Sequence, residues 1–263
     1  MTSPSLALTD TATMLRRDVR HAVRFPMLTI SGLIMPVLFL LLFDGVFGHT
    51  LRAGLGGAVS GGYINYVLPG ILVMTAASVA EATGLGVNAD KAEGIIARFR
   101  TMAIWRPSVL AGQVAGSVIR TLITGAAVCL FALVLGLSPN ANALDWLVAS
   151  GLFVLLSLAL SWLTVAFGLL ANTPSGANSL ALILVVLPFL SSAFVPTAAM
   201  PPGVRAFAEY QPFTSIIDTL RGLLTGSPIG HQGLVSVAWC VGIAVVGSLW
   251  AVKLYNRDSP VAT

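Results

Sequence analysis

Six long apolar runs constrain the fold more than any other feature of this sequence. They cover residues 28–47, 66–88, 108–137, 146–171, 177–197 and 232–254. At the helical rise, about 20 residues cross a hydrocarbon core that is roughly 30 Å thick. The sequence therefore predicts an all-α integral membrane protein with six transmembrane helices, in a single transmembrane domain that spans residues 1–263.

The composition excludes an ordinary soluble protein. Hydrophobic residues make up 56% of the 263 residues and charged residues only 9%, whereas soluble domains carry about 25% charged residues. The net charge is +4, but the chain has only two lysines, and most arginines flank apolar runs instead of forming a basic face. We therefore expect membrane lipid as a partner and no nucleic acid.

The positive charges also indicate an orientation. Ten lysines and arginines lie before the first run, in the segment from Lys91 to Arg106, or at the end of the chain at Lys253 and Arg257, and three lie in the alternate loops. Cytoplasmic segments near span ends are enriched in these residues. We expect both termini in the cytoplasm and the chain in a bacterial plasma membrane. The turn at residues 172–178 is then cytoplasmic although it carries no positive charge, with Thr173 or Ser175 capping the next helix.

A basic segment, residues 9–25, precedes the first run. Its apolar residues recur at helical spacing while its arginines occupy other faces, which is typical of a helix lying in the membrane interface. Phe25-Pro26 interrupts the helix direction. The segment is predicted to be an elbow helix, followed by a retained first span instead of a cleaved signal peptide.

The fifth run contains two prolines. Pro188 removes a backbone hydrogen bond and is expected to kink the fifth helix, and Pro196 is expected to end it. The kink is either a hinge or a static adaptation to packing.

Residues 198–231 form neither a simple loop nor a full span. After Pro201, apolar and charged residues alternate at helical spacing, and Pro212 interrupts the pattern. Two external helices bent at Pro212, dipping partway into the outer leaflet like a re-entrant pair, fit this segment. Asp218 and Arg221 stand three residues apart and are expected to pair at the rim.

No catalytic motif is present. Neither lysine is preceded by glycine, so the GxxxxGK[ST] phosphate-binding loop has no place in the chain, and GxSxG, HExxH and CxxC are absent as well. Cys129 and Cys240 both lie inside apolar runs, where a thiol behaves as a small hydrophobe. We expect no catalytic residue, no metal and no bound cofactor in this chain.

One segment between apolar runs is unusually charged. Residues 90–106, DKAEGIIARFRTMAIWR, hold six of the 24 charged residues. As a short helix the segment presents two groups of side chains to a soluble partner. The polar group comprises Lys91, Glu93, Arg98 and Arg100, and the apolar knob comprises Ile95, Ile96 and Phe99.

Two ionisable residues, Glu81 and Arg120, fall inside predicted spans. Burying a charge in the membrane costs at least about 3 kcal/mol, so each is a functional hypothesis. Two interpretations remain open. The residues form a structural ion pair that fixes the register of neighbouring helices, or they contact substrate or couple its movement.

Two blocks of sequence resemble a known family. The family is that of the membrane subunits of ABC-2 type exporters, particularly the daunorubicin-resistance-like branch. Its cytoplasmic coupling segment is similar to the first block, EGIIARFRTMAIWRPSVLAGQVAGSVIRTL (93–122). Its signature before the last span is similar to the second block, LPFLSSAFVPTAAMPPGVRAFAEYQPFTSIIDTLRGLLTG (187–226). The resemblance covers nearly the whole chain. Many relatives carry a proline just before the isoleucine where this chain has Ala103-Ile104.

The resemblance implies a half-transporter that pairs with a second permease subunit, as a homodimer or heterodimer, and with two ABC ATPase subunits that bind ATP and Mg²⁺. It assigns contact with the ATPase to the coupling segment 90–106, with these residues: Glu93, Gly94, Arg98, Phe99, Arg100 and Arg106. It also implies that the chain is a drug-efflux transport subunit, not an enzyme.

Several cargoes and mechanisms remain as alternatives. The aliphatic spans favour outward movement of a hydrophobic or amphipathic, drug-like compound, but the same architecture elsewhere moves lipids and cell-surface glycans. An ion-coupled secondary carrier would use Glu81 and Arg120 as a relay. A membrane anchor or sensor without transport is a third class.

Overall fold

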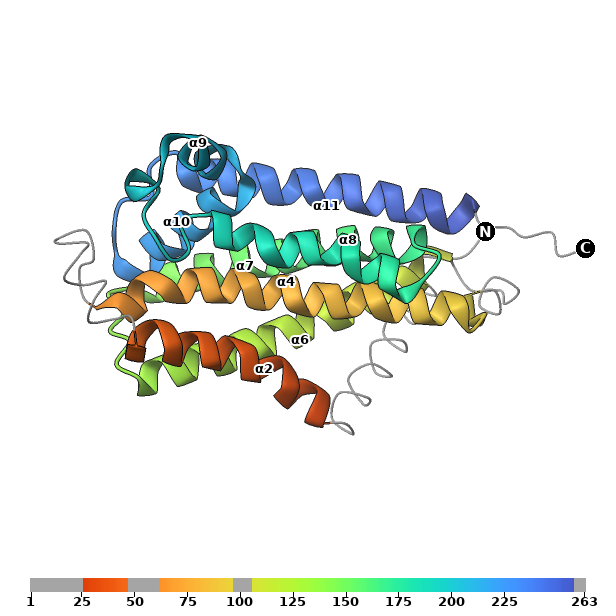
Figure 1. The fold of residues 1–263 in the computed structure, drawn as a ribbon, viewed down its shortest axis with the longest axis horizontal. Coiled ribbons are helices and arrows are strands. Elements are labelled where there is room, and N and C mark those ends of the chain that lie inside the picture. Colours follow the sequence, from red (N-terminus) through yellow and green to blue (C-terminus); the bar gives the residue numbers. More distant parts are fainter. Residues whose placement is uncertain (1–25, 47–61, 97–105, 258–263) are drawn as a thin grey trace, which may run out of the picture.

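The structure is a computed structural model that describes residues 26–46, 62–96 and 106–257, apart from the side chains of residues 26–32, 44 and 106–108. Within these residues all regular structure is helical. Figure 1 shows the longer helices side by side in an elongated bundle. The elements are α2 (Pro26–Leu40), continued by the π-helix η1 (Leu41–Val46), α4 (Tyr63–Ala92), α6 (Arg106–Val134), α7 (Ala143–Leu170), α8 (Pro174–Val186), the 3₁₀ helices η3 (Leu187–Leu190) and η4 (Thr197–Ala199), α9 (Pro202–Tyr210), α10 (Pro212–Thr225) and α11 (Gln232–Arg257).

Four of these helices are long and apolar enough to cross a membrane, as expected for an integral membrane protein. They are α4, α6, α7 and α11. The predicted first and fifth spans, 28–47 and 177–197, appear as shorter apolar helices in α2–η1 and α8–η3. The predicted elbow helix, residues 9–25, lies outside the described residues.

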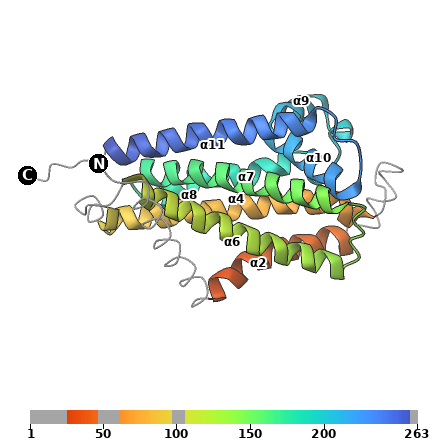
Figure 2. The same ribbon diagram turned by 180° about the vertical axis from the view of Figure 1, so that it is seen from behind.

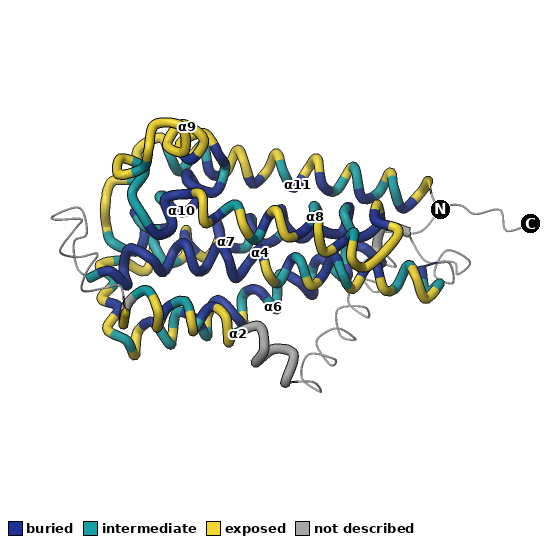
Figure 3. The backbone as a smooth tube through the Cα atoms, viewed as in Figure 1, coloured by how far each residue is buried: buried dark blue, intermediate teal, exposed yellow. Residues whose placement is uncertain are grey.

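Helix α4 is the centre of the bundle. It packs against α2, α6, α7, α8 and α10, and every residue from Tyr63 to Ala77 is buried. Figure 3 shows this part of α4 in dark blue, with exposed and intermediate residues toward its other end. A helix that is apolar and buried on all sides is typical of a bundle interior.

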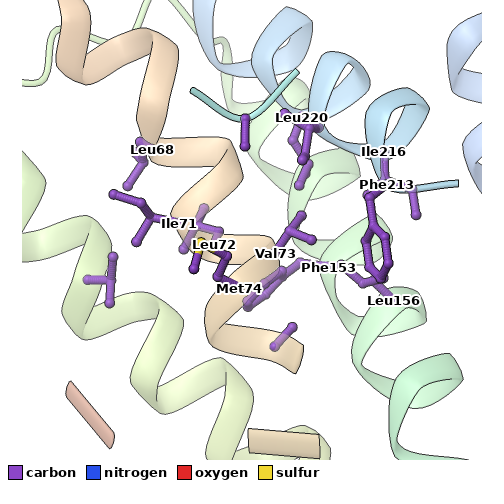
Figure 4. Packing of buried hydrophobic residues seen from close by; sticks show 14 of the residues in the cluster. Leu68, Ile71, Leu72, Val73, Met74, Phe153, Leu156, Phe213, Ile216 and Leu220 are labelled. Carbon is purple, nitrogen blue, oxygen red and sulfur yellow. The ribbon is translucent and has the colours of Figure 1, made fainter. Parts of the chain in front are cut away.

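The main hydrophobic core lies where α4, α7 and α10 meet. Figure 4 shows side chains of the three helices turned toward one another. The labelled residues are Leu68, Ile71, Leu72, Val73 and Met74 of α4, Phe153 and Leu156 of α7, and Phe213, Ile216 and Leu220 of α10. Outward-facing leucines and valines on α6 and α11, such as Leu130 and Leu249, stay exposed. Such a surface suits contact with lipid.

Glycines allow the closest helix contacts. A Cβ atom built on Gly168 of α7 would overlap the carbonyl oxygen of Gly84 on α4, and one on Gly84 would lie 2.5 Å from the carbonyl oxygen of Thr164. Small residues at such crossings let two backbones approach within a membrane. The α4–α7 distance is therefore set by these two glycines.

The fifth apolar helix is shorter than the sequence predicts. The α-helix ends at Val186 instead of continuing to residue 197, a 3₁₀ turn follows over Leu187–Leu190, and residues 191–196 are not helical. Pro188 has no N–H to donate to the carbonyl of Leu184, which explains why it ends the α-helix instead of kinking it. Thr173 caps the other end by accepting a bond from the Gly176 N–H (3.1 Å), as predicted.

The helices α9 and α10 meet at a sharp bend. The first ends at Tyr210 and the second begins at Pro212, so the predicted interruption at Pro212 is confirmed. Pro201 precedes the first turn of α9. Gly226, with φ of 72°, ends α10 in the left-handed conformation that glycine tolerates best.

The bundle has two distinct ends, visible in Figures 1 and 2. At the α10 end, α9 and α10 lie beside the start of α4 and the turn before α7. At the Lys91 end, the last turn of α4 meets the start of α6 and the last turns of α7 and α11. Both views show the beginning of α2 diverging from the other helices, whereas its end packs on the bundle.

Candidate functional sites at the two ends of the bundle

The predicted coupling segment begins at the Lys91 end. Helix α4 stops at Ala92, and Gly94 follows with φ of 71°, donating its N–H to the Lys91 carbonyl at 3.2 Å. A left-handed glycine in this place ends a helix and redirects the chain. Glu93, at this turn, is exposed. The redirection explains why the segment is not a simple continuation of α4.

The other predicted coupling residues have less structure to report. Arg98, Phe99 and Arg100 lie outside the described residues. Arg106 is the first residue of α6, with its side chain outside the description. The structure therefore places the two ends of the segment, and the assignment of these four residues stays a prediction.

Lys91 does not belong to an exposed polar face, as the sequence suggested. Its ammonium group donates to the carbonyl oxygens of Leu169 (2.6 Å) and Ala171 (3.4 Å) at the end of α7. The last carbonyls of a helix have no partner within the helix and carry partial negative charge. A lysine from the neighbouring helix satisfies both needs, which is why the side chain turns inward.

Asn88, one turn earlier on α4, reinforces this contact. Its side-chain amide donates to the carbonyl oxygens of Gly168 and Ala171, each at 2.9 Å, and the residue is buried. Together with Lys91 it joins the end of α4 to the end of α7 by four hydrogen bonds. We call these contacts the α7 clasp.

Ile96 was expected to form part of an apolar knob for a soluble partner, and that expectation is wrong. The side chain is 6% exposed and packs in a second hydrophobic cluster. Its neighbours in the cluster are Val87, Leu110, Val114, Leu169, Ala251 and Tyr255. The start of the coupling segment thus belongs to a cluster that α4, α6, α7 and α11 share.

Glu81 and Arg120 do not form an ion pair in the described structure. Arg120 Nη2 instead donates to Thr83 Oγ1 at 3.2 Å. Thr83 lies two positions after Glu81, which corresponds to about 200° around a helix, so the carboxylate and the hydroxyl point in different directions. Glu81 has no hydrogen-bond or ion-pair partner among the described residues.

The Thr83 hydroxyl belongs to a buried polar chain across three helices. Thr83 Oγ1 donates to Ser117 Oγ of α6, which also accepts from Ser161 Oγ of α7, both at 2.8 Å. Hydroxyls that bond across helices hold membrane bundles together. By donating to Thr83, Arg120 therefore extends a structural contact between α4, α6 and α7.

At the α10 end, the predicted pair between Asp218 and Arg221 is confirmed. Arg221 Nη1 lies 2.6 Å from Asp218 Oδ1, and both side chains are only partly exposed, at 16% for the arginine and 33% for the aspartate. The guanidinium carbon also lies 3.8 Å from the centre of the Tyr66 ring. Stacking on an aromatic face adds to the ion pair.

Both members of the ion pair also bind the non-helical segment after α8. Asp218 accepts from the Ser192 hydroxyl and Arg221 Nη2 donates to the Ser192 carbonyl, each at 2.6 Å. The hydroxyl of Tyr66 donates to the same carbonyl at 3.0 Å. We call Tyr66, Ser192, Asp218 and Arg221 the outer cluster.

Further side chains satisfy the carbonyls that the shortened helix leaves open. The Tyr63 hydroxyl donates to the Phe194 carbonyl at 2.8 Å, the Gln211 amide to the Leu190 carbonyl, and the Ser191 hydroxyl to the Pro188 carbonyl. Irregular backbone is tolerated at membrane depth only where protein satisfies it. Pro196 follows this segment and precedes η4.

Sequence reasoning did not find Tyr63, Tyr66, Ser192 or Asn88. The two tyrosines lie three residues apart at the start of α4, a spacing that places both on one helix face, and this was the available signal. The serine lies in what looked like a continuous span, and the asparagine in a predicted helix end. Their partners come from distant parts of the chain, so local patterns carry no sign of them.

The chain is similar to known proteins. Residues 9–225 match the ABC-2 type transporter family. The chain is 28% identical over 255 residues to the daunorubicin resistance ABC transporter permease protein DrrB1 of Streptomyces coeruleorubidus, covering 96% of this chain and 88% of that protein.

Two further relatives are more distant. The probable doxorubicin resistance ABC transporter permease protein DrrC of Mycobacterium tuberculosis is 24% identical over 230 residues, 88% of this chain and 82% of its own. The putative transport permease ycf38 of Porphyra purpurea is 27% identical over 221 residues, which cover 82% of this chain and 74% of that protein. Because the family match spans most of the sequence, this chain belongs to the ABC-2 type transporter family, as an integral membrane transport subunit whose family implies an ABC ATPase partner.

Proposed function

We propose that the chain is the permease half of an exporter that moves a hydrophobic or amphipathic, drug-like compound out of a bacterial cell. The similarity to the daunorubicin resistance permease over almost the whole chain carries this proposal. Two copies of a separate ABC ATPase supply ATP hydrolysis, with ATP and Mg²⁺ bound there, and a second permease subunit completes the pathway. This chain supplies no catalytic residue.

The Lys91 end faces the cytoplasm in this proposal, and the α10 end faces outward. The distribution of lysines and arginines along the sequence supports this orientation. Six crossings follow if α2–η1 and α8–η3 also span the membrane. The 13 residues of α8 and the four of η3 measure about 28 Å at α-helical and 3₁₀ rises, close to the thickness of a hydrocarbon core.

The α7 clasp suggests how movement enters the membrane part. The ATPase binds the coupling segment around Glu93, Gly94, Arg98, Phe99, Arg100 and Arg106. Because Ile96 is buried in the cluster at the Lys91 end and Lys91 and Asn88 hold the end of α7, a displacement of the segment acts on α7 as well as on α4 and α6. Helix α11, which packs along α7, follows.

The outer cluster is the proposed external gate. It joins α4, the segment after α8 and α10 through one ion pair and its bonds to Ser192. Prolines mark the starts of the short helices around it: Pro188 at η3, Pro196 before η4, Pro201 before α9 and Pro212 at α10. The cluster therefore lies where short helices meet. Release of these bonds would free the segment after α8 to move and open an exit.

Transport in inside-out vesicles tests the function directly. The chain is produced with the ABC ATPase that copurifies with it, and uptake of daunorubicin is followed with ATP, with a non-hydrolysable ATP analogue, or with a proton gradient alone. We expect uptake only with hydrolysable ATP and only when both chains are present. Uptake driven by the proton gradient without ATP would establish an ion-coupled carrier instead, and ATP-driven movement of labelled lipid alone would identify a lipid exporter.

A further inference from the structure

The half of α4 toward the Lys91 end has one exposed face. Four small residues lie on it at helical spacing and are all exposed: Ser78, Ala82, Gly86 and Ala89. Glu81 and Leu85 flank them and are partly exposed, whereas the opposite face, with Thr83 and Val87, is buried. The central helix of the bundle is therefore open to its surroundings along this strip alone.

Glu81 lies deep within the span. It lies eleven positions before Ala92 at the end of α4, which is about 17 Å of helix. It has no hydrogen-bond or ion-pair partner within the described part of the chain, since Arg120 reaches Thr83 on another face of α4. A carboxylate at this depth is costly unless it meets a cation, a polar partner or water.

Helix α2 does not pack over this face of α4. The beginning of α2 diverges from the bundle and does not cover this half of α4, as Figures 1 and 2 both show. A Cβ atom built on Gly86 would meet nothing within 4 Å. Small side chains therefore form a low apolar surface next to a single negative charge.

We propose that Glu81 is a cargo-binding residue that selects organic cations. The positive group of an amphipathic cation pairs with the Glu81 carboxylate, and its apolar part packs on Ser78, Ala82, Gly86 and Leu85. This inference rests on the proposed function, because it names the class of compound that the exporter carries. Charge complementarity favours this occupant over a lipid chain, which would leave the carboxylate without a partner.

A second copy of the chain is the main rival occupant. If two copies met along this face about a twofold axis, the two Glu81 carboxylates would approach each other, because an isologous interface presents the same patch from both sides. Like charges held close in a membrane repel with little screening. A cation avoids this repulsion.

Binding of a matched pair of probes tests the inference. The permease and its ATPase are placed in lipid nanodiscs, and equilibrium dialysis measures the binding of tetraphenylphosphonium, a cation, and triphenylphosphine oxide, a neutral compound with similar rings. We expect Glu81→Gln to weaken cation binding by about tenfold, equivalent to the loss of one charge contact, and to leave the neutral compound within about twofold. Glu209→Gln, which removes an exposed carboxylate of α9, is the control and leaves both probes unchanged.

Chemical labelling locates the site without any measurement of transport. Dicyclohexylcarbodiimide modifies carboxyl groups in apolar surroundings, and mass spectrometry identifies the labelled residue. Glu81 is expected to be labelled, and tetraphenylphosphonium, but not triphenylphosphine oxide, is expected to protect it. Equal cation binding by wild type and Glu81→Gln, or no protection by the cation, would overturn the inference.

The outcomes separate this inference from the proposed function. ATP-driven drug uptake that is unaffected by Glu81→Gln leaves the exporter in place and removes the cation site. Protection of Glu81 by the cation without any ATP-driven uptake keeps the site and removes the exporter. Efficient cross-linking between two copies carrying Ser78→Cys would show that the face is a subunit interface, and the inference would then be wrong.

Discussion

At the scale of single residues, side chains supply the hydrogen bonds that interrupted or ended helices lack. Lys91 and Asn88 bind the last carbonyls of α7, and Arg221 and Tyr66 bind the carbonyl of Ser192. Hydrogen bonds to charged groups contribute about 1.5–3 kcal/mol each, and an unmade bond in a buried place costs a similar amount. A few polar residues therefore determine where the apolar helices are held.

Lys91 provides the first prediction. Lys91→Met removes the ammonium group from the end of α7 and keeps the length of the side chain, so ATPase binding is expected to persist while transport per ATP hydrolysed falls by about tenfold, the equivalent of about 1.4 kcal/mol. The measurement is the ratio of drug uptake to phosphate release in vesicles. Lys253→Met is the control, because Lys253 is exposed at the same end of the bundle. An equal fall of this ratio in Lys91→Met and Lys253→Met would contradict a specific role of the α7 clasp.

Arg221 provides the second prediction. Arg221→Met leaves the Ser192 carbonyl short of a donor and the Asp218 carboxylate unpaired, and the loss of a partly buried pair is expected to lower thermal stability by about 2–4 kcal/mol. Arg205→Met breaks the exposed Arg205–Glu209 pair of α9, and exposed pairs contribute about 0–1 kcal/mol. Thermal unfolding of the detergent-solubilised complex compares the two. Equal shifts of the unfolding temperature in Arg221→Met and Arg205→Met would show that the outer cluster adds no stability.

The sequence predicts single contacts only where both partners are near in the chain. Asp218 and Arg221 stand three residues apart on one helix, so their pair was foreseeable. Lys91 and Ile96 look like exposed members of a charged segment, but α7 and α11 arrive later in the chain and bury them. The direction of such a side chain is decided by a partner that the local pattern does not contain.

At the scale of elements, the contact between α4 and α7 depends on two glycines facing each other. Gly84 and Gly168 bring the two backbones together without room for a methyl group. Only at this short distance do Asn88 and Lys91 of the α7 clasp reach the carbonyls at the end of α7. Packing and hydrogen bonding at the Lys91 end are therefore parts of one contact.

Gly168→Ala tests this contact. The added methyl group would overlap the Gly84 carbonyl, so we expect a loss of about 1–3 kcal/mol in stability, as in other overpacked cores. Gly151→Ala in the same helix is a matched control, because its Cβ would meet nothing within 4 Å, and alanine favours a helix over glycine by about 1 kcal/mol. If the unfolding temperatures of Gly168→Ala and Gly151→Ala fell by the same amount, the close crossing of α4 and α7 would be ruled out.

The lengths of elements were less predictable than their existence. Apolar composition predicted the four long helices, yet the fifth α-helix ends at Val186, eleven residues before the predicted boundary at 197. The run of apolar residues continues past Pro188, so hydropathy has no signal there. Hydrogen bonds from distant side chains such as Tyr63, Tyr66 and Arg221 to the carbonyls that follow stabilise the non-helical alternative.

At the scale of the whole molecule, the proposed orientation places the turn between α7 and α8 in the cytoplasm. In a variant whose native cysteines, Cys129 and Cys240, are replaced by alanine, Ser227→Cys is expected to react with an impermeant maleimide on intact cells. Asn172→Cys is expected to react only after permeabilisation. Both positions are exposed. Labelling of Asn172→Cys from outside would contradict the six crossings, because the turn would then be extracellular.

The central position of α4 has a consequence for biosynthesis. The ribosome makes α4 long before the partners of its polar residues: Ser192 follows Tyr66 by 126 residues, Phe194 follows Tyr63 by 131, and Arg221 follows the Tyr66 carbonyl by 155. At a synthesis rate of about 5–20 residues per second, the last of these takes roughly 8–30 s to appear. During that interval the helix sits among lipids or insertion machinery before its two tyrosines meet the carbonyls that they bind in the folded protein. Nascent chains released before α10 is complete are therefore natural targets for membrane quality control.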